Sequence, residues 1–415
     1  MSSRELVKGW ERSSGLRPFE RTKKSILQAF NVFNSRLKKG YIGRDIEVAR
    51  VTEGLASYGD FRRVAYTMLE VEGHGREPLD QCYGHWIRSL ARGDQVDRVR
   101  SVIDHMRARN RDVPLSVYNE ALFALGKNGR VKECLLIKEE LDKELRKLDD
   151  VTYTALINSA GESQRMKLAR KLWNEMLARR VKPEVQTFGA YMRAHVRCED
   201  YKGAAIMYEV YNAEGRKTDR VSDLQAIIAY GQMGEVKKAT EVYQIAERRY
   251  KNRFPKQLDH AMIQVFVEAD LMQAADMLFK KIKYSADIMI FNTMFRAYAK
   301  QGKLEDFENL MTYLENETTM LPAASTKEAV EMLRGALERQ GRMDEKHVQE
   351  RLDELRRCVN RARSGRLRNR ELRFMPPPQE PPKREQRYLK PENTWDWEQG
   401  RRGSSSEKSA DEASQ

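Results

Sequence analysis

The chain has 415 residues, of which 76 are basic and 62 acidic, and its pI is near 9.4. No stretch approaches the roughly 18 consecutive apolar residues of a membrane-spanning helix, so the sequence argues against an integral membrane protein. The four cysteines, Cys82, Cys134, Cys198 and Cys358, are far apart without a CxxC motif. This spacing argues against a disulfide framework and a structural zinc site. Cys134 is expected to be a core residue.

The net charge of +14 belongs mainly to the two ends of the chain. Residues 1–44 carry 11 basic and 3 acidic side chains, and residues 359–415 carry 13 and 9. Residues 45–358 are therefore nearly neutral. A basic protein of this kind is a candidate for nucleic-acid binding. We expect the two arms to supply most of the sequence-independent attraction to phosphates.

The N-terminal arm mixes arginine with glutamate and lacks the apolar segment of a secretory signal, and it resembles a transit peptide only weakly. Residues 22–38 form an amphipathic basic pattern with apolar residues at Ile26, Leu27, Phe30, Phe33 and Leu37. This pattern predicts a helix that caps the first structural unit. Binding to a membrane surface is the alternative.

A helical hairpin is predicted for residues 150–184, which read DVTYTALINSAGESQRMKLARKLWNEMLARRVKPE. Apolar residues recur at helical spacing first around Leu156 and then around Leu172, which indicates two short amphipathic helices. One hairpin of this size buries too little surface to fold alone, so stacked neighbours are required.

The neighbours follow at a period of 35 residues, with unit starts at Asp45, Asp80, Leu115, Asp150, Val185 and Arg220. An aromatic residue stands fourth in most units, and glycine stands fifteenth in several. Prolines, which helix interiors reject, fall at unit junctions. After Phe254 the period slips: one unit is shorter by two or three residues, and the next begins near Ile288. The pattern predicts about eight units between residues 45 and 323.

The segments VTYTALI, MKLARKLWNEM and VKPE resemble the pentatricopeptide repeat, a helical hairpin of about this length that ends in a Lys-Pro-Asp-like turn. The tetratricopeptide repeat is the rival, but it prefers glycine at the eighth position and alanine at the twenty-seventh. Here the eighth residues are mostly bulky, for example Ile157. The resemblance implies an all-α fold, a right-handed α-solenoid superhelix of helix-turn-helix repeats.

Beyond the repeats, residues 324–358 are predicted to form C-terminal capping helices. Residues 359–415 are rich in arginine and proline, a composition that predicts a disordered tail. The aromatic residues of the tail, Tyr388, Trp395 and Trp397, are expected either to pack on the solenoid or to anchor a partner.

No catalytic motif was found. The sequence lacks the zinc-deaminase pattern, a phosphate-binding P-loop and a separate domain with clustered aspartates, and its six histidines are scattered. We therefore expect no enzymatic activity, no cofactor and no metal site.

Single-stranded RNA can be read by helical repeats at one base per unit. The resemblance implies that the fifth and last residues of each unit read the base and that the second residue flanks it. The resulting pairs are Asn119 with Asp149, Thr154 with Glu184, and Gly189 with Asp219, while Asn292 is poorly matched by Pro322. Val151 is the flanking residue of its unit. Basic residues at the thirteenth position could approach phosphates, namely Arg92, Lys127, Arg197 and Lys300. By the same resemblance Asn with Asp selects uracil, and Thr with Asp selects guanine.

The function expected from this resemblance is organellar single-stranded RNA binding in processing, stability or translation, in the mitochondrion or alternatively the plastid. A structural subunit of a ribonucleoprotein such as the mitochondrial ribosome is the first alternative, with ribosomal RNA and ribosomal proteins as partners. A peptide-binding scaffold is the second.

Overall fold

The computed structural model describes residues 23–41, 43–251, 254–283, 286–317, 324–342 and 346–363. Within them lie nineteen α-helices, one short 3-10 helix and no strand, so the all-α prediction is confirmed. No helix in this part of the chain is both long and apolar enough to cross a membrane. The predictions for residues 1–22, for Pro322 and for residues 364–415, with Tyr388, Trp395 and Trp397, concern positions outside the described residues. Residues 359–363 were predicted to belong to the disordered tail, which is wrong, because α20 continues to Arg363.

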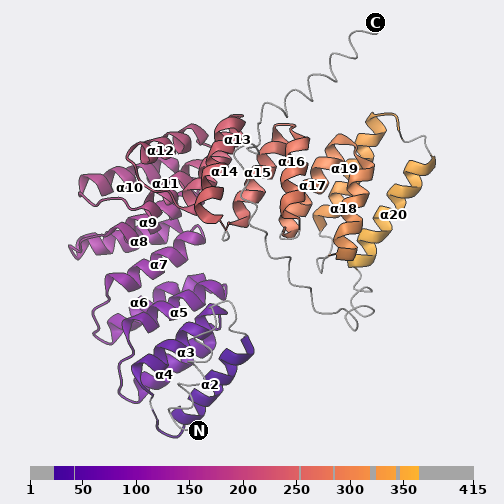
Figure 1. Ribbon diagram of the computed structural model, residues 1–415. Coiled ribbons are helices and arrows are strands. Elements are labelled where there is room, and N and C mark those ends of the chain that lie inside the picture. Colours follow the sequence, from indigo (N-terminus) through magenta and orange to yellow (C-terminus); the bar gives the residue numbers. More distant parts are fainter. Residues whose placement is uncertain are drawn as a thin grey trace. The chain divides into compact units, whose positions relative to one another are not determined.

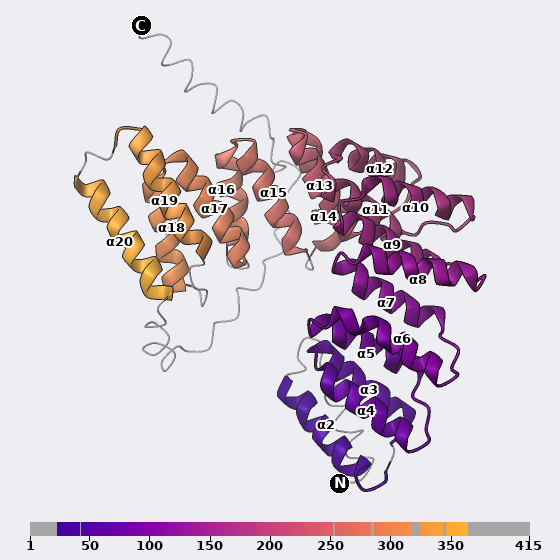
Figure 2. The same cartoon turned by 180° about the vertical axis from the view of Figure 1, so that it is seen from behind.

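The chain divides into two compact units, residues 1–219 and 220–415 (Figures 1 and 2). In the described part of the first unit, one helix precedes five hairpins. Its elements are α2 (Lys23–Leu37), α3 (Asp45–Ser57), α4 (Phe61–Gly73), α5 (Asp80–Arg92), η2 (Val96–Arg98), α6 (Val99–Ala108), α7 (Leu115–Lys127), α8 (Val131–Lys143), α9 (Asp150–Glu162), α10 (Met166–Ala178), α11 (Val185–Arg197) and α12 (Tyr201–Ala213).

The second unit continues with helices paired in the same way. Its elements are α13 (Arg220–Gln232), α14 (Val236–Tyr250), α15 (Lys256–Glu268), α16 (Met272–Ile282), α17 (Ile288–Gln301), α18 (Leu304–Glu317), α19 (Ala324–Arg339) and α20 (Lys346–Arg363). Helix α19 packs against α17, and α20 packs against α19.

A helix begins at each of the six predicted unit starts, from Asp45 to Arg220, which confirms the period of 35. The slip that follows comes from element lengths. Helix α14 has 15 residues, whereas α8, α10 and α12 have 13. The next first helix therefore begins at Lys256, and a short α16 brings the following one to Ile288.

Both turns of a hairpin close on a residue in the left-handed conformation. The fifteenth residue of each unit has a positive φ, namely Gly59, Asp94, Gly129, Gln164, Glu199, Gly234, Asp270 and Gly302. The thirty-first residue does too in the first five units, namely Gly75, Asn110, Leu145, Arg180 and Gly215. A left-handed residue after the last helical turn is a common way to end a helix. The fifteenth-position glycines noted in the sequence thus mark the turns within hairpins.

The helices of the first unit form two layers. The first helices of successive hairpins, α3, α5, α7, α9 and α11, pack against one another, and we call them the first-helix layer. The second helices cover this layer and form the second-helix layer. Close approach within the first-helix layer depends on glycine: a Cβ added at Gly161 of α9 would lie 2.8 Å from the Cα of Ala194.

Helix α2 packs against α3, at the position predicted for an N-terminal cap. It buries Ile26, Phe30, Phe33 and Leu37, and the side chain of Ile26 lies against Gly54 of α3. Burial of these four apolar side chains covers the end of the first-helix layer.

The fourth residue of each unit fills the space between the two layers. Tyr153 is fully buried, and its hydroxyl donates a hydrogen bond to Glu175 of α10 at 3.1 Å. In residues 220–415 the carboxylate can stand on the first helix and the tyrosine on the second. Buried Asp259 is the fourth residue of its repeat, and it accepts a hydrogen bond from the hydroxyl of Tyr243 at 2.6 Å. Asp223, which departs from the aromatic pattern, likewise accepts from Tyr250 at 2.9 Å.

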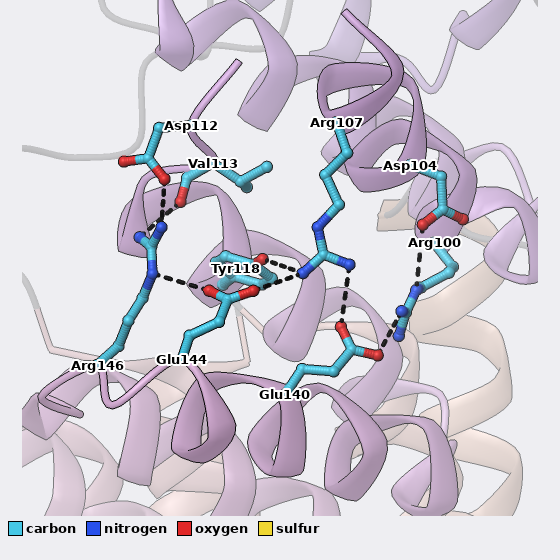
Figure 3. A network of polar contacts seen from close by, with 9 residues as sticks. All are labelled: Arg100, Asp104, Arg107, Asp112, Val113, Tyr118, Glu140, Glu144 and Arg146. Carbon is cyan, nitrogen blue, oxygen red and sulfur yellow. Dashed lines mark hydrogen bonds and ion pairs between the residues drawn. The ribbon is translucent and has the colours of Figure 1, made fainter. Parts of the chain in front are cut away.

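An arginine at the thirty-second position joins consecutive repeats in the first unit. Arg111 donates to the carbonyl oxygen of Pro78 at 3.0 Å, Arg146 to that of Val113 at 2.8 Å, and Arg216 to that of Pro183 at 3.4 Å. Figure 3 shows Arg146 held also by Asp112 and Glu144. Each arginine thus binds the turn that precedes its own repeat and holds that turn in place.

Replacing Leu156 by Ala tests the packing of α9. This side chain is 1% exposed, so its truncation should lower the free energy of unfolding by about 2–5 kcal/mol. The loss should spread to α7 and α11, because repeats are stabilised by their neighbours. Denaturant unfolding and hydrogen exchange measure both effects.

Leu145→Ala is the matched control, since Leu145 is 92% exposed and should change stability by no more than about 0.5 kcal/mol. Equal effects of the two substitutions would show that the buried face of α9 is misassigned.

Candidate nucleic-acid interface

The structure brings together the fifth and last residues of the third repeat, which begins at Leu115, as predicted. Asn119 lies on α7, and Asp149 is the N-cap of α9, the adjacent first helix. The Asn119 Nδ2 atom donates to the two carboxylate oxygens of Asp149 at 3.3 and 3.4 Å. The amide is 6% exposed, whereas Asp149 is partly exposed. The pair therefore lies in the seam between two repeats.

Thr152, the third residue of the next unit, completes this cluster. Its hydroxyl lies 2.8 Å from Asn119 Oδ1 and 2.7 Å from Asp149 Oδ1, and its single proton can serve one of them at a time. The Thr152 backbone N–H donates to the same Asp149 oxygen at 2.8 Å. With its Oδ1 turned to Thr152, the Asn119 amide directs its Nδ2 donor group towards Asp149.

In the second predicted pair, the side chains of Thr154 and Glu184 do not bond to each other. Thr154 is buried, and its hydroxyl lies 2.8 Å from the hydroxyl of Thr187 and 2.8 Å from the carbonyl oxygen of Asp150. Glu184 is exposed, and its backbone N–H donates to Asp150 Oδ1 at 3.0 Å. The hydroxyl of the fifth residue, Thr154, therefore contacts the next repeat and joins the two repeats.

A bond between the third residue of one first helix and the fifth residue of the preceding one also occurs in residues 220–415. There Thr326, the third residue of α19, donates to Oδ1 of Asn292, the fifth residue of α17, at 3.3 Å. A bond from the third residue of one first helix to the fifth residue of the preceding one thus occurs three times among the described repeats. The sequence analysis did not identify the third residue. The available signal was threonine at Thr152 and Thr187 after a polar fifth residue.

The remaining predicted positions are placed as follows. Gly189 is buried in α11, and Asp219, at the end of the first unit, is partly exposed. Val151, the second residue of its unit, is an exposed apolar side chain, as are Ile46 and Met289 at the same position. The second position can therefore offer an apolar contact on α3, α9 and α17.

The thirteenth-position basic residues all lie exposed at the ends of first helices. Two of them have partners: Arg92 donates to the carbonyl oxygen of Ala56 at 3.3 Å, and Arg197 forms an ion pair with Glu162 at 3.4 Å. Among the described residues no ion pair involves Lys127 or Lys300. Of the four basic residues, these two therefore have the ammonium groups most available to bind a phosphate.

Phe123 is a functional candidate that the sequence analysis missed. It is 37% exposed, more than any other phenylalanine or tryptophan in the described part of the chain. It stands four residues after Asn119 and four before Lys127 on α7, so the three side chains share one face of the helix. The signal was an aromatic ninth residue where neighbouring units have Arg88 and Asn158.

The described residues contain no group of three or more His, Cys, Asp or Glu side chains that could hold a metal ion. Cys134 is fully buried, as expected of a core residue, and burial raises the pKa of its thiol to about 11. Burial also lowers the pKa of His85 below its ordinary value. Cys134 thus belongs to the core of its hairpin, whereas His85 is partly exposed and lies 3.0 Å from the hydroxyl of Thr52 through its Nδ1 atom.

Comparison with known proteins gives two matches to family models. One, described as the PPR repeat family, covers residues 148–197, and the other, described as the PPR repeat, covers residues 289–315. Two Arabidopsis thaliana proteins named as mitochondrial pentatricopeptide repeat-containing proteins are each 27% identical, over 101 and 105 residues. Those alignments span 24% and 25% of this chain, but 12% and 22% of the length of the relatives.

Among solved structures, the maize pentatricopeptide repeat protein PPR10 in complex with an 18-nucleotide psaJ RNA element superimposes with a TM-score of 0.59 and 14% identity. The superposition covers 83% of this chain and 49% of that one. This likeness shows the α-solenoid fold.

Thr152→Val tests the cluster around Asn119. Loss of the hydroxyl leaves a buried amide oxygen with one partner fewer, which should lower the free energy of unfolding by about 1–3 kcal/mol. Denaturant unfolding of the full chain measures the change.

Thr67→Val is the control, because the Thr67 hydroxyl is equally buried but bonds only the carbonyl oxygen of Arg63 in its own helix, at 2.8 Å. If both variants lose the same stability, the link between repeats contributes nothing beyond an ordinary buried hydroxyl.

Proposed function

From the pentatricopeptide repeats that the chain carries, we propose that the protein binds single-stranded RNA along its first-helix layer and acts in organellar RNA processing, stability or translation. The observation that carries the proposal is the arrangement on α7. There an amide paired with a carboxylate, an exposed aromatic ring and an exposed ammonium group follow one another along a single helix face.

Asn119, Phe123 and Lys127 stand at i, i+4 and i+8, so they span about 12 Å along the helix axis. The amide of Asn119 and the carboxylate of Asp149 supply a donor and an acceptor for a base edge. Phe123 offers a surface on which a base can stack, and Lys127 offers a charge for a phosphate. These are the contacts by which proteins hold single-stranded nucleic acid.

Base reading by direct contact requires bases that are free of a complementary strand, and this requirement favours single-stranded RNA as the ligand. A duplex hides its base edges in grooves that helix side chains reach poorly in RNA. The proposed role is one of binding, with Asp149 acting as a hydrogen-bond acceptor rather than as a catalytic base.

We place this function in the mitochondrion. The support is that both Arabidopsis relatives carry that compartment in their names. A plastid location is the alternative, and fractionation of cells expressing the tagged full-length chain distinguishes the two compartments.

A structural subunit of a ribonucleoprotein, such as the mitochondrial ribosome, is the second candidate. It is favoured by the use of the fifth residue between repeats: Thr154 bonds Thr187, and Gly189 has no side chain to offer a base. With one well-formed pair in the first unit, sequence selection would be limited. Sedimentation with ribosomal particles in high salt would favour this candidate.

Asn119→Thr tests base reading at the third unit. We expect the preferred base at one position to change from U towards G, with discrimination of about 1 kcal/mol, since single mispaired edges cost roughly 1–3 kcal/mol. Selection of RNA ligands from a random pool with both proteins measures the preference. The same motif from both proteins, or no motif from the unmutated one, would refute base reading by this unit.

Phe123→Leu tests the stacking surface. Leucine keeps an apolar side chain of similar size, but it lacks the aromatic face. The binding free energy should therefore become weaker by about 1–3 kcal/mol for RNAs of any sequence. Fluorescence anisotropy with the selected RNA measures it. Leu136→Ala on α8, at an exposed apolar position in the second-helix layer, should leave affinity unchanged. Equal losses would contradict a specific role for the ring.

A further inference from the structure

A strong positive charge is concentrated on one helix of the second-helix layer. Residues 165–182, which comprise α10 and its flanking turns, contain seven basic side chains and one acidic one. This excess occurs inside the repeat array, whose total charge is nearly neutral. It is therefore a local feature of one hairpin.

The single acidic residue does not face the solvent beside these charges. Glu175 is turned towards the neighbouring helices, where it accepts from Tyr153 at 3.1 Å and pairs with Lys138 and Arg179 at 2.8 Å each. Arg179 is paired further with Asp142 at 2.9 Å. The exposed face of α10 thus contains basic groups and no carboxylate.

Five basic residues of this segment make no ion pair with any described residue, and all five are exposed. They are Arg165, Lys167, Lys171, Arg180 and Lys182, and we call them the α10 basic face. Arg170 adds a sixth charge, with a loose pair to Asp200 at 3.7 Å.

The members of the α10 basic face that lie within the helix, Lys167 and Lys171, are exposed on the side opposite its contacts with the rest of the hairpin. The opposite side of the helix is formed by Ala169, Leu172, Trp173 and Met176, which are buried against the rest of the hairpin. Lys167 and Lys171 are four residues apart on the exposed side, so their side chains are neighbours along the helix. Figure 1 shows α10 at the edge of the first unit.

Other second helices of the unit do not share this charge. Helix α8 has Lys132, Lys138 and Lys143, but it also has Glu133, Glu139, Glu140 and Asp142. Helix α12 has one basic residue, Lys202, and one acidic residue, Glu209. Counted with their flanking turns, as for α10, residues 60–77 have three basic and four acidic side chains, 98–112 five and two, 130–147 six and five, and 200–217 three and three. The segment of α10 thus carries the largest positive excess among the second helices of residues 1–219.

The surroundings of these charges indicate which polyanion fits. Binding to single strands combines charge with aromatic stacking, but the one aromatic ring of the segment, Trp173, is buried. Attachment to a membrane surface needs a broad apolar face beside the charges, but α10 exposes a single large apolar side chain, Leu177. Double-helical RNA is recognised mainly through its phosphates and sugars, and a row of unpaired cations suits it.

We propose that the α10 basic face binds the phosphate backbone of a double-helical RNA segment. This second RNA surface is independent of base reading on the first-helix layer. Together, the two surfaces would let one molecule hold a single-stranded element on one layer and a folded stem on the other.

The test replaces Lys167, Lys171 and Lys182 together by glutamine in the full chain. The probes are a 20-base-pair RNA duplex of mixed sequence and the single-stranded RNA obtained by selection. Affinity for the duplex is measured over a range of salt. Each lost phosphate contact should reduce the magnitude of the slope of log affinity against log salt by about 0.9, so the loss of three contacts should reduce it by nearly three. Binding of the single strand should change little.

The matched control replaces Lys132, Lys143 and Lys202 by glutamine, an equal change of charge on the exposed faces of α8 and α12. It should leave the duplex slope unchanged. Equal losses in both variants would show attraction by net charge alone and would overturn the proposal. So would an unchanged duplex slope in the α10 variant.

The outcomes separate this inference from the proposed function. If the unmutated protein binds the duplex through α10 and selects no single strand, base reading fails and the second surface stands. If it selects a single strand but does not bind the duplex, the second surface fails alone. Binding of the α10 basic face to anionic phospholipid vesicles in preference to the duplex would assign it to a membrane and overturn the proposal.

Discussion

No hairpin of this protein can bury its apolar surface alone, and every other feature depends on that constraint. Two helices of about 13 residues make too few contacts to be stable, so each repeat is completed by its neighbours. The candidate site has the same property. Asn119 comes from one repeat, while Asp149 and Thr152 stand at the start of the next first helix, and the three meet only because α7 and α9 are packed together.

Much of this architecture can be read from the sequence, because stacking imposes a period. The helix starts follow from the spacing of apolar and aromatic residues, and the meeting of Asn119 with Asp149 follows from their register. Glycines such as Gly129 indicate some of the turns. The structure shows the left-handed conformation at Asp94 and Gln164 as well, because the packed helices set the geometry of the turn whichever residue occupies it.

What the sequence could not predict depends on where individual side chains point. Thr152 reaches Asn119 across 33 residues, and a list of fifth and last residues does not include it. Phe123 has the apolar character of a core residue, and only its exposure distinguishes it from Leu122, which is buried beside it. The positive charge of α10 is not visible in the total charge of the repeat array, which is nearly neutral. The exposed face of α10 is purely basic because its one acidic residue, Glu175, is turned towards the neighbouring helices.

Asp149 has two tasks that are usually kept apart. Its carboxylate begins α9 by accepting from the Thr152 backbone N–H, and it also lies beside the amide that would read a base. A lineage that drifted to another residue here would alter its RNA preference and weaken a helix terminus in one step, since an N-cap contributes about 1 kcal/mol. Specificity at this repeat is therefore harder to change by neutral mutation than at repeats whose last residue caps nothing, such as the one ending in Glu184. New targets would be acquired more readily through those other repeats.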